Sequence, residues 1–304
     1  MNWLFLIHWL MALVLAPLLL GVINKTKAWF GGRVGPPLLQ PYHDLVKLLG
    51  KGAVYSRTTT WLFRAGPIIG LAAVAMALTL VPFGGAPALL AFPGDLVLLA
   101  YLLGLARFFT VVAALDTGSA FEGMGASREV WFSALCEPAL LLALAAVARE
   151  TNQLSLSAIH AQITPARWAS GGLTLVLVGV ALVVILLVEN CRIPFDDPNT
   201  HLELTMIHEV MVLDHGGPDL AFILYAGALK LWLIGSLLLS VVLPASGQVW
   251  YDLAQALLAM FGLAVLVGAI ESSMARLRLP RVPQLLVGAA ALAVLALLLE
   301  VWKP

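Results

Sequence analysis

Long apolar stretches separated by shorter polar connections make up most of this chain. A helix that crosses the hydrocarbon layer of a bilayer needs about 20 consecutive, mostly apolar residues. Eight stretches meet this requirement, at residues 3–23, 65–83, 95–115, 129–148, 170–189, 219–243, 250–274 and 283–302. The pattern predicts an all-α, polytopic integral membrane protein with about eight transmembrane helices, built as a single membrane domain over residues 1–304.

Two of the connections carry signals of their own. Between Pro41 and Lys51, aliphatic residues recur at helical spacing beside Asp44 and Lys47, which predicts a short amphipathic helix lying in the membrane interface. The connection at residues 116–128 is rich in glycine, so we predict a loop there, with Ser127 capping the fourth span. We also predict that Pro67 lies in the first turn of the second span, a position that suits proline.

Basic residues are concentrated in the odd-numbered connections. Most of them lie in the first and seventh connections, at Lys25, Lys27, Arg33, Lys47, Lys51, Arg57, Arg276, Arg278 and Arg281. Cytoplasmic loops of membrane proteins carry the excess of Lys and Arg. The charge bias therefore predicts that the odd-numbered loops are cytoplasmic and that both termini lie outside.

The composition agrees with this prediction and narrows the function. Hydrophobic residues make up 61% of the chain and charged residues 11%, with a mean hydropathy of +0.97, whereas soluble domains carry roughly 25% charged residues. The formal net charge is zero, which gives no support to nucleic-acid binding. The only cysteines, Cys136 and Cys191, are too few for an iron–sulfur or nickel–iron centre. We therefore predict no cofactor in this chain.

Glu137 is the most informative single residue. It lies inside the fourth predicted span and is followed by Pro138, which removes the hydrogen bond to the carbonyl of Ala134 and kinks the helix. An ionised carboxylate inside a membrane costs a few kcal/mol or more, so such residues usually have a function. We interpret Glu137 as a residue that gains and loses a proton. The alternative is a structural hydrogen bond between helices.

Other charged residues also fall within predicted spans. Arg107 and Lys230 need anionic partners, for which Glu137 and Glu189 are candidates, although sequence does not assign the pairs. Ion pairs that only stabilise packing would produce the same pattern. Glu271 lies near a predicted cytoplasmic end, where its side chain could equally reach water.

The polar segment after the fifth span is the densest group of acids and histidines in the chain. Together with acids near the third connection it forms a row toward one side, which predicts a proton path through Glu122, Glu129, Glu137, Glu189, Asp196, His201, Glu203 and Glu209. His201 fits because imidazole titrates near neutral pH. Solvated loop charges would give a similar list. His201, Glu203, His208, Glu209 and His215 could also bind a metal, but no recognised ligand spacing is present, so no metal site is predicted.

Several motifs, taken together, resemble one known family. Residues 32–49, GRVGPPLLQPYHDLVKLL, resemble a motif of the respiratory complex I subunit 1 family, which belongs to NADH-quinone oxidoreductases. Residues 115–119 (LDTGS), 125–129 (GASRE) with Glu137-Pro138, and 273–279 (SMARLRL) resemble its membrane-bound group 4 hydrogenase and formate hydrogenlyase branch. Pro194-Phe195-Asp196 with Glu203-Leu204 resembles the family's acidic loop between spans five and six.

This resemblance implies a subunit that anchors a soluble redox arm to a membrane arm. Partner subunits would carry iron–sulfur clusters and, in the hydrogenase branch, a nickel–iron site, and neighbouring membrane subunits would be antiporter-like. The family's pattern implies that Arg33, Gln40, Asp44 and Arg128 border a quinone-type chamber or the soluble arm. It also implies that Glu129, Glu137, Glu189, Asp196 and Glu203 couple redox change to ion movement.

One departure refines this expectation. Asn199 and His201 stand where the family's acidic loop usually has further glutamates, which favours the hydrogenase-like branch over ordinary quinone reduction. We therefore predict a membrane-anchoring, energy-coupling subunit in the inner (plasma) membrane of a prokaryotic cell, not catalytic alone, that links redox chemistry to proton or sodium translocation. The alternatives are a quinone-chamber subunit, a stand-alone ion transporter, for which no inverted repeat is visible, and a purely structural anchor.

Overall fold

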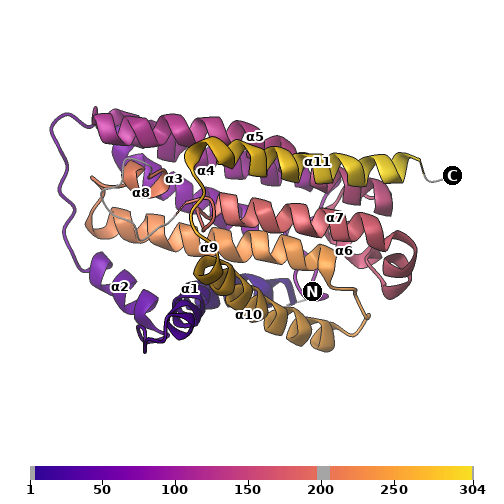
Figure 1. Ribbon diagram of the computed structural model, residues 1–304. Helices are drawn as coiled ribbons and strands as arrows, with labels where there is room; N and C mark the ends of the chain where they lie inside the picture. Colours follow the sequence, from indigo (N-terminus) through magenta and orange to yellow (C-terminus); the bar gives the residue numbers. More distant parts are fainter. Residues whose placement is uncertain (1–3, 197–205, 303–304) are drawn as a thin grey trace.

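The computed structural model describes residues 4–196 and 206–302, which form a helical membrane protein (Figure 1). Within these described residues, eight helices are long and apolar enough to cross a membrane, so the predicted fold class is confirmed. The helices of the described residues are α1 (Leu4–Phe30), α2 (Gln40–Leu49), α3 (Trp61–Leu78), α4 (Asp95–Asp116), α5 (Ala120–Thr151), α6 (Leu156–Gln162), α7 (Pro165–Glu189), α8 (His208–Met211), α9 (Gly217–Val242), α10 (Val249–Ser273) and α11 (Val282–Val301), with a 3₁₀ turn at Leu279–Arg281.

The short amphipathic helix predicted between Pro41 and Lys51 is confirmed as α2, whereas the predicted starts of the second and fourth spans are wrong. α3 begins at Trp61, capped by Thr60, so Pro67 lies inside the helix and not in its first turn. α5 begins at Ala120, which makes the predicted glycine-rich loop mostly helical. Ser127 therefore does not cap a helix, and its Oγ donates to the carbonyl of Met124 at 2.9 Å.

Gly125 provides a physical reason for the error in α5. A Cβ on Gly125 would collide with Val210 and would lie 2.8 Å from the carbonyl oxygen of Ile207. The glycine is therefore required for close packing of α5 against the segment that contains α8. Glycine needed for packing and glycine needed for a turn are indistinguishable in one sequence.

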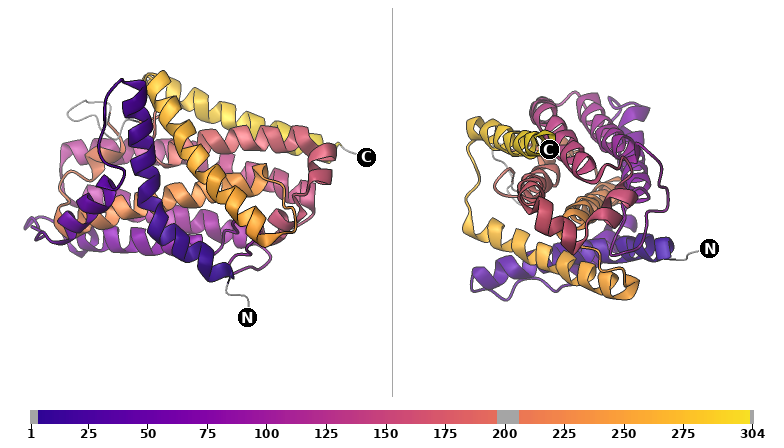
Figure 2. Two further views of the ribbon diagram at one scale, coloured as in Figure 1. Left: turned by 90° about the horizontal axis from the view of Figure 1, so that it is seen from below. Right: turned by 90° about the vertical axis from the view of Figure 1, so that its right-hand side faces the viewer.

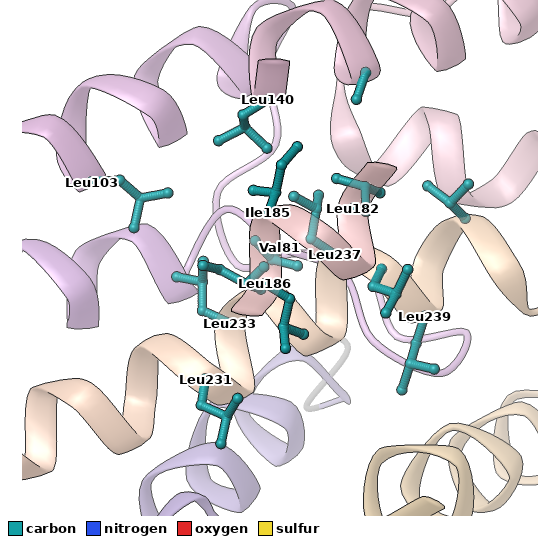
Figure 3. Close-up of a cluster of buried hydrophobic side chains, with 14 of the residues drawn as sticks. Val81, Leu103, Leu140, Leu182, Ile185, Leu186, Leu231, Leu233, Leu237 and Leu239 are labelled. Atoms are coloured by element: carbon teal, nitrogen blue, oxygen red, sulfur yellow. The ribbon is translucent and has the colours of Figure 1, made fainter. Parts of the chain in front are cut away.

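Two helices form the centre of the bundle. In the most apolar stretch of each helix, 61% of residues are buried in α7 and 67% in α9, against 28% in α4, α10 and α11. Figure 3 shows Leu182, Ile185 and Leu186 of α7 close to Leu233 and Leu237 of α9. The outer helices thus keep apolar faces available for lipid or for other membrane subunits.

The helices do not all run in the same direction relative to the bundle. α5, α7, α9 and α11 lie roughly side by side, whereas α1 and α10 cross the bundle steeply (Figures 1 and 2). α1 contains Pro17 and α5 contains Pro138, and α7 is non-helical at Gly171. Prolines and non-helical residues of this kind are the usual points at which helices bend.

Candidate functional site

Arg107 of α4 is the centre of a buried charged cluster. Its Nε lies 3.1 Å from Glu129 Oε1, its Nη1 lies 2.5 Å from Glu137 Oε1, and its Nη2 is paired with Glu189 Oε1. Glu129 and Glu137 lie on α5, and Glu189 is the last residue of α7. A planar guanidinium has donors in several directions, so one arginine can hold carboxylates from two other helices.

Lys230 of α9 completes the cluster. Its Nζ lies 3.6 Å from Glu189 Oε2, so Glu189 is shared between two cations. The structure thus resolves the pairing that sequence left open. Three carboxylates face two permanent cations here, which gives these five side chains one negative charge in excess when all are ionised. One added proton would neutralise the cluster.

The three carboxylates differ in burial. The side chains of Glu189 and Glu129 are 3% and 14% exposed, whereas that of Glu137 is 46% exposed. Glu137 faces Gly104 of α4, where a Cβ would lie only 3.7 Å from Glu137 Oε1. Tyr101 and Phe108, one turn to either side of Gly104, are exposed. Glu137 therefore reaches outward from the cluster onto an otherwise apolar helix face.

A cavity of about 400 Å³ lies beside this cluster. Its charged end includes Arg107, Glu129, Glu189 and Lys230, together with His208 and Glu209. Its apolar walls come mainly from α3, α4 and α9 and include Val74, Leu103 and Leu224, and α1 contributes Leu20. This volume is within the usual range of small-molecule sites, and the combination of a polar end with apolar walls suits an amphipathic molecule.

Two histidines of the α7–α9 connection line the cavity. Burial lowers the pKa of His208 to about 4, and nearby Lys230 contributes to the shift. Burial also lowers the pKa of His215, which stacks on Phe63 with ring centroids 3.9 Å apart. Both rings are therefore neutral at pH 7.

Within residues 4–196 and 206–302, no group of three or more His, Cys, Asp or Glu side chains could hold a metal ion.

Asp196 organises the polar connection that carries these histidines. Its Oδ1 lies 2.7 Å from Arg276 Nη2, and its Oδ2 accepts from the backbone N–H groups of Ile207 and His208 at 3.2 and 3.1 Å. Arg128 donates to the carbonyl of Met206 at 2.9 Å from the other side. These contacts hold α8, and with it His208 and Glu209, against the cavity.

The remaining predicted site residues lie elsewhere. Glu122 is buried away from Arg107 and accepts from the backbone N–H of Asp214 at 3.1 Å. Arg33, Gln40 and Asp44 lie on the exposed surface around α2 and do not line the cavity, with Gln40 Nε2 donating to Asp44 Oδ1 at 2.9 Å. His201 and Glu203 fall outside the described residues.

For Glu271, the suggested contact with water is wrong. Its side chain is fully buried, 2.8 Å from Lys27 Nζ and 3.3 Å from Arg192 Nη1. Sequence reasoning also missed the acids at the other end of the bundle, where Glu300 accepts from Thr174 Oγ1 at 2.5 Å and Glu150 lies near Arg167. Both acids sit at ends of apolar stretches, which was the available signal.

Residues 2–301 match the family model described as NADH dehydrogenase. The chain belongs to the NADH dehydrogenase family. This confirms the resemblance inferred from the motifs, and the match covers all eight membrane-spanning helices.

The names of two relatives fit the hydrogenase and formate hydrogenlyase branch that the motifs predict. The chain is 32% identical to formate hydrogenlyase subunit 4 of Escherichia coli (strain K12), over 96% of this chain and 97% of that one. It is 34% identical to hydrogenase-4 component C of the same organism, over 76% and 72% of the two chains. A chain from the archaeal membrane-bound sulfane sulfur reductase has the same fold, with a TM-score of 0.82 at 22% identity over 98% of each chain.

Proposed function

We propose that this protein is the membrane-anchoring, energy-coupling subunit of a multisubunit, hydrogenase-like oxidoreductase. The observation that carries this proposal is the Arg107 cluster, in which one guanidinium is shared by Glu129, Glu137 and Glu189 beside an internal cavity. The formate hydrogenlyase and hydrogenase-4 relatives, each named as one subunit or component of such a system, support the same role.

Charge transfer through the cluster follows from its composition. Because the carboxylates exceed the cations by one, the cluster can hold one proton at little electrostatic cost. Protonation of Glu129, which among the described residues is paired with Arg107 alone, weakens its attraction to the guanidinium, and the guanidinium then interacts more strongly with Glu137 and Glu189. A change on the buried side is thereby passed to the outward-facing carboxylate of Glu137.

The polar connection between α7 and α9 is the segment through which a redox partner would act on the cluster. Asp196 joins this connection to Arg276 beyond α10, and Arg128 joins it to α5. A redox partner docked on this side would shift the connection, and with it Glu189 and His208. We propose that this side is cytoplasmic, as the excess of Lys and Arg in the odd-numbered loops predicts.

The face of α4 and α5 around Glu137 is where the cluster would act on a neighbouring membrane subunit. A half-exposed ionised carboxylate is costly against lipid, so a polar group of a neighbouring membrane subunit covers it. We propose an antiporter-like subunit there, moving protons or sodium, and soluble partners that hold iron–sulfur clusters and a nickel–iron site. The complex would lie in the inner (plasma) membrane of a prokaryotic cell.

The experiment that tests this proposal is the Glu137→Gln substitution. Glutamine keeps the shape and a hydrogen bond to Arg107 but cannot ionise. We expect the complex to assemble and to retain its redox activity with a soluble electron acceptor, while ion translocation in proteoliposomes falls about tenfold or more, the scale on which removal of an acid–base group acts. The measurement is the initial rate of ion uptake per electron transferred.

The matched control is Glu300→Gln, a buried acid of another span that hydrogen-bonds Thr174 away from Arg107. It should leave the ratio of ions to electrons unchanged. A normal ratio in Glu137→Gln would remove this residue from the coupling scheme.

A second candidate function is a quinone-chamber subunit, which the cavity favours. The polar end around Arg107 and His208 would hold a quinone head group, and Leu20, Val74 and Leu224 would line its isoprenoid tail. A bound quinone would accept electrons and protons from the soluble arm. Crosslinking by a photoreactive quinone to peptides of α3 and α9 would favour this candidate, and crosslinking confined to partner subunits would count against it.

A further inference from the structure

The bend in α1 exposes a backbone carbonyl that another helix satisfies. Pro17 has no N–H, so the carbonyl of Leu13 loses its helical hydrogen bond. The hydroxyl of Tyr225 on α9 donates to this carbonyl at 2.8 Å. An unpaired carbonyl inside a membrane is costly, so this bond joins the bend of α1 directly to α9.

A second tyrosine donates a hydrogen bond to the next carbonyl of α1. The hydroxyl of Tyr42 on α2 donates to the carbonyl of Val14 and accepts from the backbone of Leu18. It is thus inserted into the hydrogen-bond ladder of α1 at the bend. Burial raises the pKa of Tyr42, although the backbone of Leu18 opposes the shift, so the hydroxyl remains a donor at physiological pH.

The amphipathic helix α2 lies on the surface of the bundle. None of its residues is fully buried. The turn before α2 packs on α1 at Gly21, where a Cβ would collide with the carbonyl of Leu38. The hydroxyl of Tyr42 therefore links α2 directly to the bend of α1.

The cavity reaches the surface of the helical bundle next to this bend. Leu224 and Gly227 of α9 line the cavity and are also exposed, with 44% of Leu224 accessible. Leu20 of α1, one turn beyond Pro17, lines the same cavity. An apolar molecule could therefore enter between α1, α3 and α9, and the position of α1 would decide the width of this portal.

We propose that Tyr42 and Tyr225 form a latch that holds the bend of α1 against α9 and keeps the membrane portal of the cavity narrow. Loss of the hydrogen bond made by either hydroxyl frees α1 to move outward, and this movement widens the portal. The proposal does not depend on the role of the Arg107 cluster or on which apolar molecule enters.

Cys191 reports the width of the portal. It lines the cavity, and the only other cysteine, Cys136, can be replaced by alanine. In membranes that contain the assembled complex, the reaction of Cys191 with the apolar reagent N-phenylmaleimide is followed by mass spectrometry. We expect Tyr42→Phe and Tyr225→Phe each to speed this reaction about three- to tenfold, the factor that corresponds to loss of one net hydrogen bond.

Two controls separate the latch from a general loosening of the protein. Tyr101→Phe removes a hydroxyl from an exposed tyrosine of α4 and should leave the rate unchanged. Pro17→Ala restores a donor for the carbonyl of Leu13, so adding Tyr225→Phe to this variant should change the rate by less than about twofold, below the effect of one net hydrogen bond.

The outcomes decide the proposal. Unchanged rates in both tyrosine variants, or equal acceleration by Tyr101→Phe, would overturn it. A full effect of Tyr225→Phe in the Pro17→Ala background would also overturn it, because the tyrosine would then act independently of the bend. If Tyr225→Phe prevents assembly, Tyr42→Phe on the amphipathic helix α2 tests the same latch.

Discussion

Arg107 shows how one side chain can connect three helices of a membrane protein. Its guanidinium binds acids from α5 and α7, and Lys230 of α9 neutralises part of the remaining charge. The acids were visible in the sequence as charges within or beside apolar stretches. Arg107 was also visible as a cation that needs anionic partners, but the pairing was not, because Glu129 and Glu189 are 60 positions apart and meet only in the folded bundle.

At the scale of one residue, His208 predicts an acid-dependent stability. Its folded pKa of about 4 lies below the ordinary 6.5, so between these values the unfolded chain binds a proton that the folded chain does not. Stability from this residue is present above pH 6.5 and is lost as the pH falls toward 4. At pH 5 the loss is at most about 2 kcal/mol.

We therefore expect the melting temperature of the purified complex to fall between pH 7.5 and 5, and to fall less in His208→Gln. His43→Gln, on the exposed face of α2, is the matched control and should follow the original protein. An identical acid dependence in His208→Gln would show that other groups cause the loss.

At the scale of elements, α5 and α8 are held in contact by a glycine. Gly125 leaves room for Ile207, Val210 and Met211. At Gly123, two residues earlier in the same helix, a Cβ would have no heavy atom of the described residues within 4 Å. Alanine should therefore have opposite effects at these two sites.

Gly123→Ala should raise the melting temperature slightly, since alanine is favoured over glycine in a helix by roughly 0.5–1 kcal/mol. Gly125→Ala should destabilise the protein by about 1–3 kcal/mol, because a methyl group forces α8 away from α5. Thermal unfolding of both variants in detergent provides the comparison. Equal shifts of the same sign would show that α8 does not depend on this contact.

At the scale of the whole molecule, a half-exposed carboxylate on an apolar helix face points to a larger assembly. Exposed aromatic residues such as Tyr101 and Phe108 flank the outward-facing Glu137, and both cysteines are free and buried.

We expect the tagged protein, purified in mild detergent from its native membrane, to bring down subunits that contain iron and acid-labile sulfide. Metal analysis and mass spectrometry of the eluate provide the measurement. Preparations stripped with stronger detergent serve as the control and should lose these subunits. Recovery of a stable single chain with full ion-transport activity would favour the transporter.

Local properties of the chain were enough to predict its architecture. The apolar stretches that form the eight spanning helices, and the amphipathic α2, follow from hydrophobic pattern alone, because transfer into a bilayer depends on each segment separately. The family followed from short motifs, and the candidate acids from the cost of placing charge in hydrocarbon.

Contacts between segments decided the rest. The partners of Arg107, the buried pairing of Glu271, the cavity beside the cluster, and the two tyrosines on the bend of α1 all join helices that are distant in sequence. Likewise, Gly125 lies in a helix and packs against the segment of α8, although the local composition indicated a loop. These contacts depend on which helix surfaces meet in the folded protein, and the local sequence of a helix does not specify its neighbours.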